Sequence, residues 1–489
     1  MLKKSPFSLA VVSALLCGSL QAEGYKLYEQ SVSSMGTAYA GRGAQITDAS
    51  MVYSNPAALT RLQGAHFAGG ISFVAASSHY SDAQAFSANG QPVAGRSDGN
   101  NKLRSVIPFL FYSNHLNERL SYGLGLYVPF GIGAEYDNDF VGRYFATETA
   151  VQVISGQFSL GYQLNSVWSV GAGVSLNRVS GVLSKYKDHS GLCELGEAAT
   201  NALFGAPVYN DAYCYSHYEV KGDDVAPGFS IGLHGEPWQG TRLALMYQSA
   251  IRFTLTGDSV ISNTPITGAN VQGHPGYLVI APQLPAIDVS TGKLAAMPQL
   301  TEASQLDLTT PASVAFSLDQ QLTELLSLQF SLAWTEWSRF QSIDIISADP
   351  SPSISLSTEL PQNLNAAGYI GYIPQKWQNS WSAAVGLSFQ AQPNLRLKTG
   401  LAFDQNPIRP ERKTARIPTD DRTWLTLGAN WRVSAKSSLD FVIGRMWMPG
   451  VSVDEFEYNV QDQPLYQSRF QANYRNKALL IGMQFNHSF

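Results

Sequence analysis

A sequence pattern of serine hydrolases, G-x-S-x-G, occurs at residues 228–232, with Ser230 in the nucleophile position. In α/β-hydrolases this pattern forms a sharp turn between a strand and a helix, and the turn exposes the serine. Here it lies inside an alternating, strand-like window, residues 217–234, and no helical segment follows it. None of the eight histidines has a serine and an acid at a spacing typical of a catalytic triad. We therefore expect no enzyme and, without a metal or phosphate motif, no cofactor.

The first 22 residues have the layout of a cleavable export signal. Lys3 and Lys4 precede a short apolar core, and small residues follow up to Ala22, after which we predict cleavage. Two cysteines then remain, Cys193 and Cys214, in an exported chain where a disulfide can persist. We expect them to staple one long loop, because no paired histidines favour metal binding.

Composition excludes several broad classes of protein. Only 14% of the residues are charged, against about 25% in a typical soluble domain. After residue 22, no stretch approaches the roughly 20 consecutive apolar residues of a membrane helix. Without its first two lysines the chain keeps 30 of its 32 basic residues against 37 acidic ones, which gives no basis for nucleic acid binding. The chain is therefore neither an ordinary cytosolic protein nor a helical membrane protein.

From residue 65 onward, apolar and polar residues alternate in windows of about ten, the length that a tilted strand needs to cross a bilayer. In one such window Trp381, Ala383 and Val385 share a face, and Ser382 and Gly386 lie on the other. We predict fourteen strands, near residues 65–77, 102–113, 119–130, 149–163, 167–184, 217–234, 241–257, 308–318, 325–340, 380–391, 395–405, 422–433, 438–448 and 477–489.

The connections between these windows decide between two folds that share the alternation. Short connections, such as 164–166 and 392–394, take turns with long ones, such as 185–216 and 258–307. Short periplasmic turns and long external loops on an even number of strands are typical of an outer-membrane barrel, and a soluble sandwich does not require them. The predicted fold class is all-β: a 14-stranded antiparallel transmembrane β-barrel over residues 65–489.

The last window alternates as far as the final residue, Phe489. Because a chain end is usually frayed and polar, a strand that reaches it predicts pairing with the first strand to close the ring. This ending also resembles the signal read by the barrel assembly machinery. Tryptophans near the window ends are expected to form an interfacial girdle: Trp168, Trp337, Trp431 and Trp447.

Residues 23–64 lack the strand pattern and are rich in Gly, Ser and Ala. A fourteen-stranded barrel has an interior that side chains alone cannot fill, so we predict that this segment plugs it. Asn55, Pro56 and Ala57 support an ordered plug, because Asn caps helices and Pro suits the first helical position. A floppy periplasmic tail is the alternative.

These N-terminal residues also carry a resemblance. The segment from Glu23 to Ala57 resembles the hatch of the FadL/TodX family of outer-membrane transporters for long-chain fatty acids and aromatic hydrocarbons. Similar blocks recur along the chain at residues 127–131, 141–144, 311–314, 334–340, 416–418 and 421–425. The resemblance implies a route in which a hydrophobic molecule enters between external loops, reaches a pocket at the mature N-terminus and leaves sideways through the wall.

Several residues are candidates for that route. Pro129 cannot donate to a ladder and Gly131 follows it, so we expect a kink and a lateral gate at Pro129, Phe130 and Gly131. The alternative is an ordinary strand end. Family position points to Tyr25 and Leu27 in the pocket, and to Arg178 and Lys376 as nearby cations, although neither cation aligns cleanly. Apolar residues on the long loops are further candidates for binding: Leu195, Leu203, Phe204, Leu278 and Ile280.

The resulting hypothesis is passive, ligand-gated uptake of hydrophobic compounds, with long-chain fatty acids as the first candidate. Transport of aromatic hydrocarbons by the same route is the alternative, and a general porin or adhesin is the rival from another class. The expected surroundings are outer-membrane lipid and lipopolysaccharide, with assembly directed by Phe489 and no oligomeric partner.

Overall fold

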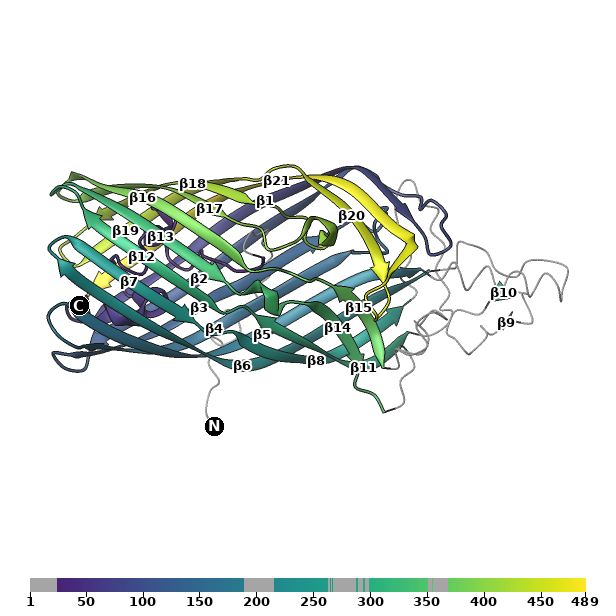
Figure 1. The fold of residues 1–489 in the computed structure, drawn as a ribbon, viewed down its shortest axis with the longest axis horizontal. Coiled ribbons are helices and arrows are strands. Elements are labelled where there is room, and N and C mark those ends of the chain that lie inside the picture. The colour runs from purple at the N-terminus through teal and green to yellow at the C-terminus, as the bar shows by residue number, and fades with distance from the viewer. Residues whose placement is uncertain are drawn as a thin grey trace, which may run out of the picture.

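The computed structural model describes residues 24–188, 215–262, 264, 266, 287–288, 293–294, 299–350, 354 and 368–489. The predicted leader and both cysteines lie outside this part. Figure 1 shows a barrel of tilted strands with the N-terminal segment, coloured purple, inside it. In the part of the chain that is described, no helix is both long and apolar enough to cross a membrane.

One antiparallel sheet contains nineteen of the described strands. They are β1 (His66–Phe86), β2 (Gly99–His115), β3 (Leu120–Glu135), β4 (Glu148–Gln163), β5 (Trp168–Asp188), β6 (Tyr215–Trp238), β7 (Thr241–Gln248), β8 (Ile251–Ser262), β11 (Leu300–Thr310), β12 (Ser313–Gln321), β13 (Leu326–Thr335), β14 (Ser342–Ser347), β15 (Tyr369–Pro374), β16 (Ser380–Gln392), β17 (Leu395–Asp404), β18 (Arg422–Arg432), β19 (Ser437–Trp447), β20 (Val451–Tyr458) and β21 (Pro464–Ser488). A separate pair is formed by β9 (Ile287–Asp288) and β10 (Lys293–Leu294).

Five barrel strands are each interrupted once, so that the nineteen segments make fourteen strands within the described residues. The two-part strands are β7 with β8, β11 with β12, β13 with β14, β15 with β16, and β19 with β20. The predicted number of strands and the predicted barrel are confirmed.

The ring is closed by the first and last strands. The β1–β21 ladder runs from His66–Ser488 to Phe86–Arg469, and the Phe489 amide donates to the Ala65 carbonyl over 3.0 Å. The predicted closure through the C-terminal strand is therefore confirmed. It leaves no free sheet edge at this join, where lipid could not satisfy backbone groups.

The outer face of the wall is apolar, as alternation predicts. Ile71, Leu124 and Leu176 are among its exposed side chains, and such residues can face lipid at no desolvation cost. Trp431 and Trp447 are exposed there too. Trp337 is an exception to the predicted girdle: it is fully buried, because the chain turns inward after β13 into the 3-10 helix η4 (Trp337–Arg339).

The N-terminal segment, residues 24–64, contains two one-turn helices and a 3-10 helix. They are α1 (Val32–Met35), α2 (Met51–Ser54) and η2 (Pro56–Arg61). Asn55 caps η2 as predicted: its Oδ1 accepts from the Ala57 amide over 3.1 Å, with Pro56 in the first helical position. The Asn55 side chain also donates to the Leu233 carbonyl of β6 over 3.1 Å, which fixes η2 to the wall.

Close approach of this segment to the wall depends on wall glycines, of which two are examples. A Cβ atom on Gly171 of β5 would lie 2.3 Å from the Ala57 nitrogen, and one on Gly400 of β17 would lie 2.1 Å from the Thr37 carbonyl carbon. Both are distances that real Cβ atoms do not show, so the wall is shaped to receive the segment's backbone.

A buried ion pair adds an electrostatic contact between wall and segment. Lys398 of β17 lies 3.4 Å from an oxygen of Asp440 of β19, and both side chains are buried. The Lys398 ammonium also donates to the Ser33 carbonyl over 2.9 Å. A lumen-facing lysine in β17 thus holds the N-terminal segment through α1.

Candidate functional site

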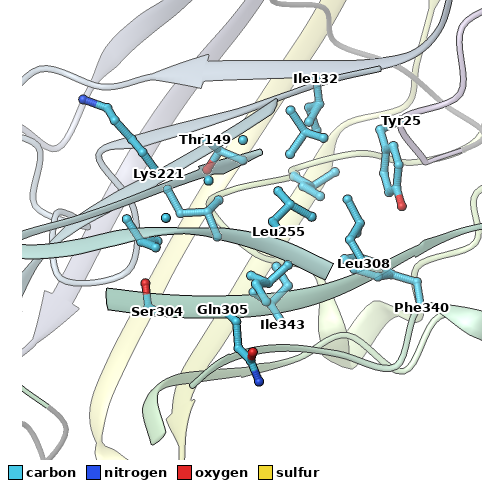
Figure 2. Close-up of a pocket in the computed structure, with 18 residues that line it drawn as sticks. Tyr25, Ile132, Thr149, Lys221, Leu255, Ser304, Gln305, Leu308, Phe340 and Ile343 are labelled. Atoms are coloured by element: carbon cyan, nitrogen blue, oxygen red, sulfur yellow. The ribbon is translucent and has the colours of Figure 1, made fainter. Parts of the chain in front are cut away.

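An apolar cavity lies inside the barrel, next to the start of the N-terminal segment at Tyr25. It holds about 690 Å³ of space between atoms, including space that is open to solvent. Figure 2 shows Tyr25 at one side of it, facing Leu308 and Phe340. Its wall comes mainly from strands β3, β4, β5, β6, β8, β11 and β14. It includes Ile132, Val151, Leu183, Val220, Leu255, Leu306, Leu308, Phe340, Ile343 and Ile417. Such a lining suits a hydrophobic ligand.

Tyr25 is held in a cluster of aromatic rings. Its ring centroid lies 4.8 Å from that of Trp337, 5.8 Å from those of Phe130 and Phe340, and 6.1 Å from that of Trp377. Two interrupted strands supply three of these partners, since residues 336–341 and 375–379 turn inward between their β segments. The sequence pattern did not identify this cluster, because Trp337 and Phe340 lie where a strand was expected.

The cavity offers no charge to a ligand within the described residues that face it. Lys221 contributes to the lining, but its ammonium lies 2.6 Å from Glu219 and points away from the apolar side chains in Figure 2. Burial raises the pKa of the Tyr25 phenol, so that the ring stays uncharged. In the described structure, the Tyr25 hydroxyl has no hydrogen-bond partner.

Arg416, which the sequence analysis did not assign to the site, is buried just behind this lining. Its guanidinium donates to Thr149 Oγ1 over 3.0 Å, and to the carbonyls of Glu148 and Ser184 over 3.0 and 3.2 Å. Thr149 lines the cavity. The contacts tie the chain between β17 and β18 to β4 and β5.

The hydrogen-bond ladder of the barrel wall is interrupted beside Tyr25. The ladder between β2 and β3 runs from His115–Ser121 to Leu110–Leu126 and ends there. At the same level Tyr127 pairs with Ser155 and Phe130 with Val153, so that Val128 and Pro129 face the single residue Ile154 of β4. This bulge is the predicted kink, and the unpaired stretch beside it is called the β2–β3 gap.

The N-terminal segment occupies the edge that β2 leaves free. Lys26 forms an antiparallel bridge with Phe130. The Gly131 amide donates to the Tyr25 carbonyl over 2.9 Å, and the Leu27 amide donates to the Pro129 carbonyl over 2.8 Å. Leu27 is fully buried but does not line the apolar cavity. The structure therefore brings Tyr25 and Leu27 to the three predicted gate residues.

The two predicted cations lie elsewhere. Arg178 is on the outer face of β5, with its side chain 67% exposed, 3.4 Å from Asp223. It shares that face with the apolar residues Val174 and Leu176, because side chains alternate along a strand. Lys376 lies 3.7 Å from Asp462 and is not part of the cavity lining. The expectation that these cations serve the pocket is not supported.

Other predicted residues lie outside the described part of the chain. They are the loop residues Leu195, Leu203, Phe204, Leu278 and Ile280, and the cysteines Cys193 and Cys214.

A second, more polar cavity, here called the polar chamber, lies on the other side of the Tyr25–Phe130 contact. It holds about 500 Å³ of space between atoms, including space that is open to solvent. Its lining includes Lys26, Tyr53, Tyr127, Pro129, Phe130, Ser155, Gln157, Ser175, Asn177, Gly228, Phe229, Ser230, Gln248, Ser249, Ile251, Pro311 and Ser313. Residues 228–230 of the G-x-S-x-G pattern therefore line it from within β6, in a strand rather than a nucleophile elbow.

Comparisons with known proteins agree with this architecture. The family model described as outer membrane protein transport protein (OMPP1/FadL/TodX) matches residues 13–489. The chain is 24% identical over 492 residues to a long-chain fatty acid transport protein of Escherichia coli, covering 99% of this chain and 98% of the relative. It is 25% identical over 503 residues to outer membrane protein P1 of Haemophilus influenzae, covering 98% of each.

Solved structures share the fold. A FadL homologue of Pseudomonas aeruginosa superposes with a TM-score of 0.78 at 24% identity, covering 95% of this chain and 100% of that one. The toluene transporter TodX of P. putida gives a TM-score of 0.63 at 16% identity, with 96% and 99% covered. Because the family model spans nearly the whole chain, the protein belongs to the OMPP1/FadL/TodX family and is a β-barrel of the Gram-negative outer membrane.

Proposed function

We propose that the protein takes up hydrophobic compounds by passive diffusion, with long-chain fatty acids as the first candidate substrate. The apolar cavity supplies the binding surface, because each methylene group removed from water contributes about 0.8 kcal/mol. Relatives named long-chain fatty acid transport protein support this choice of substrate. Residues 24–64 act as a plug in this proposal, since they fill the lumen between the cavity and the short turns.

The observation that carries the proposal is the pairing of Lys26 with Phe130 at the β2–β3 gap. A ligand that fills the apolar cavity competes with Tyr25 for its aromatic neighbours. Moving Tyr25 breaks the two backbone hydrogen bonds to Pro129 and Gly131, each of which contributes about 1 kcal/mol. Burial of a few methylene groups offsets that cost. The ligand then leaves sideways through the gap into the membrane.

A reversible cross-link tests this movement. Lys26→Cys with Phe130→Cys, in a Cys193→Ser, Cys214→Ser background, ties the N-terminal segment to β3. Purified protein in liposomes that contain no energy source should lose uptake of a labelled fatty acid on oxidation and regain it on reduction. Thr60→Cys with Ser169→Cys is the matched control, because these hydroxyls lie 2.8 Å apart in the anchored part of the segment. Unchanged uptake in the oxidised Lys26–Phe130 variant would refute the gating step.

An uncharged hydrocarbon is the second candidate substrate. The reason is that no cation among the described residues points into the apolar cavity, and a carboxylate in a dry site is costly without one. Toluene transporters share the fold. Binding of a fatty acid and of the matching alkane, measured by quenching of the buried tryptophans Trp337 and Trp377, separates the two candidates.

A further inference from the structure

The barrel wall has a second interruption, between β6 and the strand made of β7 and β8. The β6–β8 ladder runs from His217–Ser262 to Asp223–Thr256, and the β6–β7 ladder resumes at Ser230–Gln248. Residues 224–229 of β6 thus face residues 249–255, a stretch one residue longer, without ladder pairs. We call this stretch the β6–β8 break. Pro227 lies within it and has no amide hydrogen to donate.

Each strand beside the break is held firmly on its other side. The β5–β6 ladder is continuous from Trp168–Gly235 to Asp188–Tyr215. The β8–β11 ladder is continuous from Ile251–Thr310 to Ile261–Leu300. Separation of β6 from β8 over this stretch breaks no ladder pair and only one backbone hydrogen bond that the described structure shows there, from the Ser249 amide to the Phe229 carbonyl over 2.9 Å. The rest of the wall stays intact.

Side chains take over part of the missing pairing at the break. The Thr254 amide donates to an oxygen of the Asp224 carboxylate over 2.8 Å, and the Phe229 amide donates to the Ser249 hydroxyl over 2.9 Å. The Asn177 amide group of β5 donates to the Ala226 carbonyl over 3.1 Å. Rotation of a side chain can release such bonds, whereas a ladder bond requires movement of the backbone.

The break lies between the polar chamber and the outer face of the barrel. Phe229, Ser249 and Ile251 line the chamber, and Phe229 is also 50% exposed on the outer face. Val225, within the break, is 50% exposed as well. From within, the chamber presents hydroxyl and amide groups, and the buried Ser230 hydroxyl has no hydrogen-bond partner in the described structure.

We propose that the β6–β8 break is a second lateral portal, used by amphipathic molecules with a small uncharged polar head such as a hydroxyl group. The head is solvated by the polar chamber, with Ser230 among its partners, while the apolar tail passes between β6 and β8 beside Val225 and Phe229. A pure hydrocarbon gains nothing from this chamber and leaves by the β2–β3 gap. The inference rests on the proposed uptake of hydrophobic compounds and adds a route that depends on the headgroup.

A disulfide across the break tests the portal. Val225→Cys with Thr254→Cys, in the Cys193→Ser, Cys214→Ser background, places two outward residues opposite each other, since Thr254 bonds to the neighbour of Val225. In liposomes we expect the oxidised protein to lose most of its uptake of a labelled long-chain fatty alcohol, to keep its uptake of the matching alkane, and to recover on reduction. Ala172→Cys with Ile231→Cys is the control, because this exposed pair already belongs to the β5–β6 ladder.

The outcomes separate the two hypotheses. Equal uptake of the alcohol before and after oxidation, or equal loss of both probes, would overturn the portal while leaving uptake itself established. Uptake of neither probe by the unmodified protein would overturn the proposed function and the portal with it. As a measurement independent of transport, a fatty alcohol with a diazirine beside its head should label residues 228–230 or 248–251 in the wild type, and Ser230→Val should reduce that labelling; labelling confined to the apolar cavity would contradict the portal.

Discussion

The Gly131 amide of β3 donates a hydrogen bond to the carbonyl of Tyr25 over 2.9 Å, although the two residues are more than a hundred positions apart. The residues around Tyr25 thereby serve as the strand neighbour that β3 lacks after its ladder with β2 ends. The same few residues carry the ring that closes the apolar cavity. In the proposed route, one displacement of this backbone opens both the cavity and the wall.

Two substitutions at Tyr25 should differ in their effect on stability. Tyr25→Ala removes a ring that contacts four aromatic side chains, so we expect a loss of about 3 to 5 kcal/mol in the free energy of unfolding. Tyr25→Phe removes only a buried hydroxyl that has no partner in the described structure, and should be neutral or stabilising. Urea unfolding followed by tryptophan fluorescence measures both. A Tyr25→Phe variant as unstable as Tyr25→Ala would contradict this packing.

Deletion of Pro129 should close the β2–β3 gap. It removes one of the two residues that face Ile154, so β3 can continue in regular register with β4. We expect uptake of labelled fatty acid into liposomes to be lost, while the heat-modified gel mobility of a folded barrel is retained. Pro129→Ala keeps the extra residue and should transport normally. If the deletion variant transports as well as Pro129→Ala, the exit lies elsewhere.

The buried pair of Lys398 and Asp440 should fix the N-terminal segment. Lys398→Met leaves a buried carboxylate without its cation and removes the bond to Ser33, which should cost about 3 to 5 kcal/mol. Lys398→Met combined with Asp440→Asn should recover part of that loss. Hydrogen exchange of residues 32–36 reports the docking of α1, and it should increase in the single variant. Exchange that is unchanged there would show that the pair does not hold the segment.

Phe489 should matter for assembly more than for the stability of the finished barrel. Its side chain is 66% exposed, and its backbone contributes one bond to Ala65 beyond the end of β21. Deletion of Phe489 should lower the amount of folded protein in the outer membrane, and Phe489→Tyr should restore it, if an aromatic end is what the assembly machinery reads. The midpoint of urea unfolding of the protein that does assemble should barely change. Equal amounts of folded protein for the wild type, the deletion and Phe489→Tyr would exclude Phe489 as an assembly signal.

The number of strands and their closure could be predicted because both follow from local features. Alternation with a period of two marks each strand. In the closing strand, the set that begins with Leu479 and Ile481 alternates up to the chain end with the set that begins with Leu480 and Gly482. The same rule could have corrected one error. Arg178 has the same parity as Val174 and Leu176, so it had to face outward with them.

The aromatic cluster and the β6–β8 break could not be predicted in this way. Trp337 and Trp377 enter the lumen because two neighbouring strands turn inward at the same level, and that depends on pairing between segments far apart in the chain. Likewise, Pro227 lies in a window that alternates normally. Only the register on either side of it reveals that β6 has changed partner from β7 to β8.

The contact between the N-terminal segment and the closing strand also bears on biogenesis. The Gln484 side chain of β21 accepts from the Val32 amide over 2.8 Å, and Gln484 lies opposite Gly70 of β1 across the join. Gln484 is synthesised long after Val32, so this bond can form only once the last strand has been made. We therefore expect docking of residues 24–64 and sealing of the barrel to be coupled, because a barrel that closed empty would leave the Gln484 side-chain oxygen without the Val32 amide.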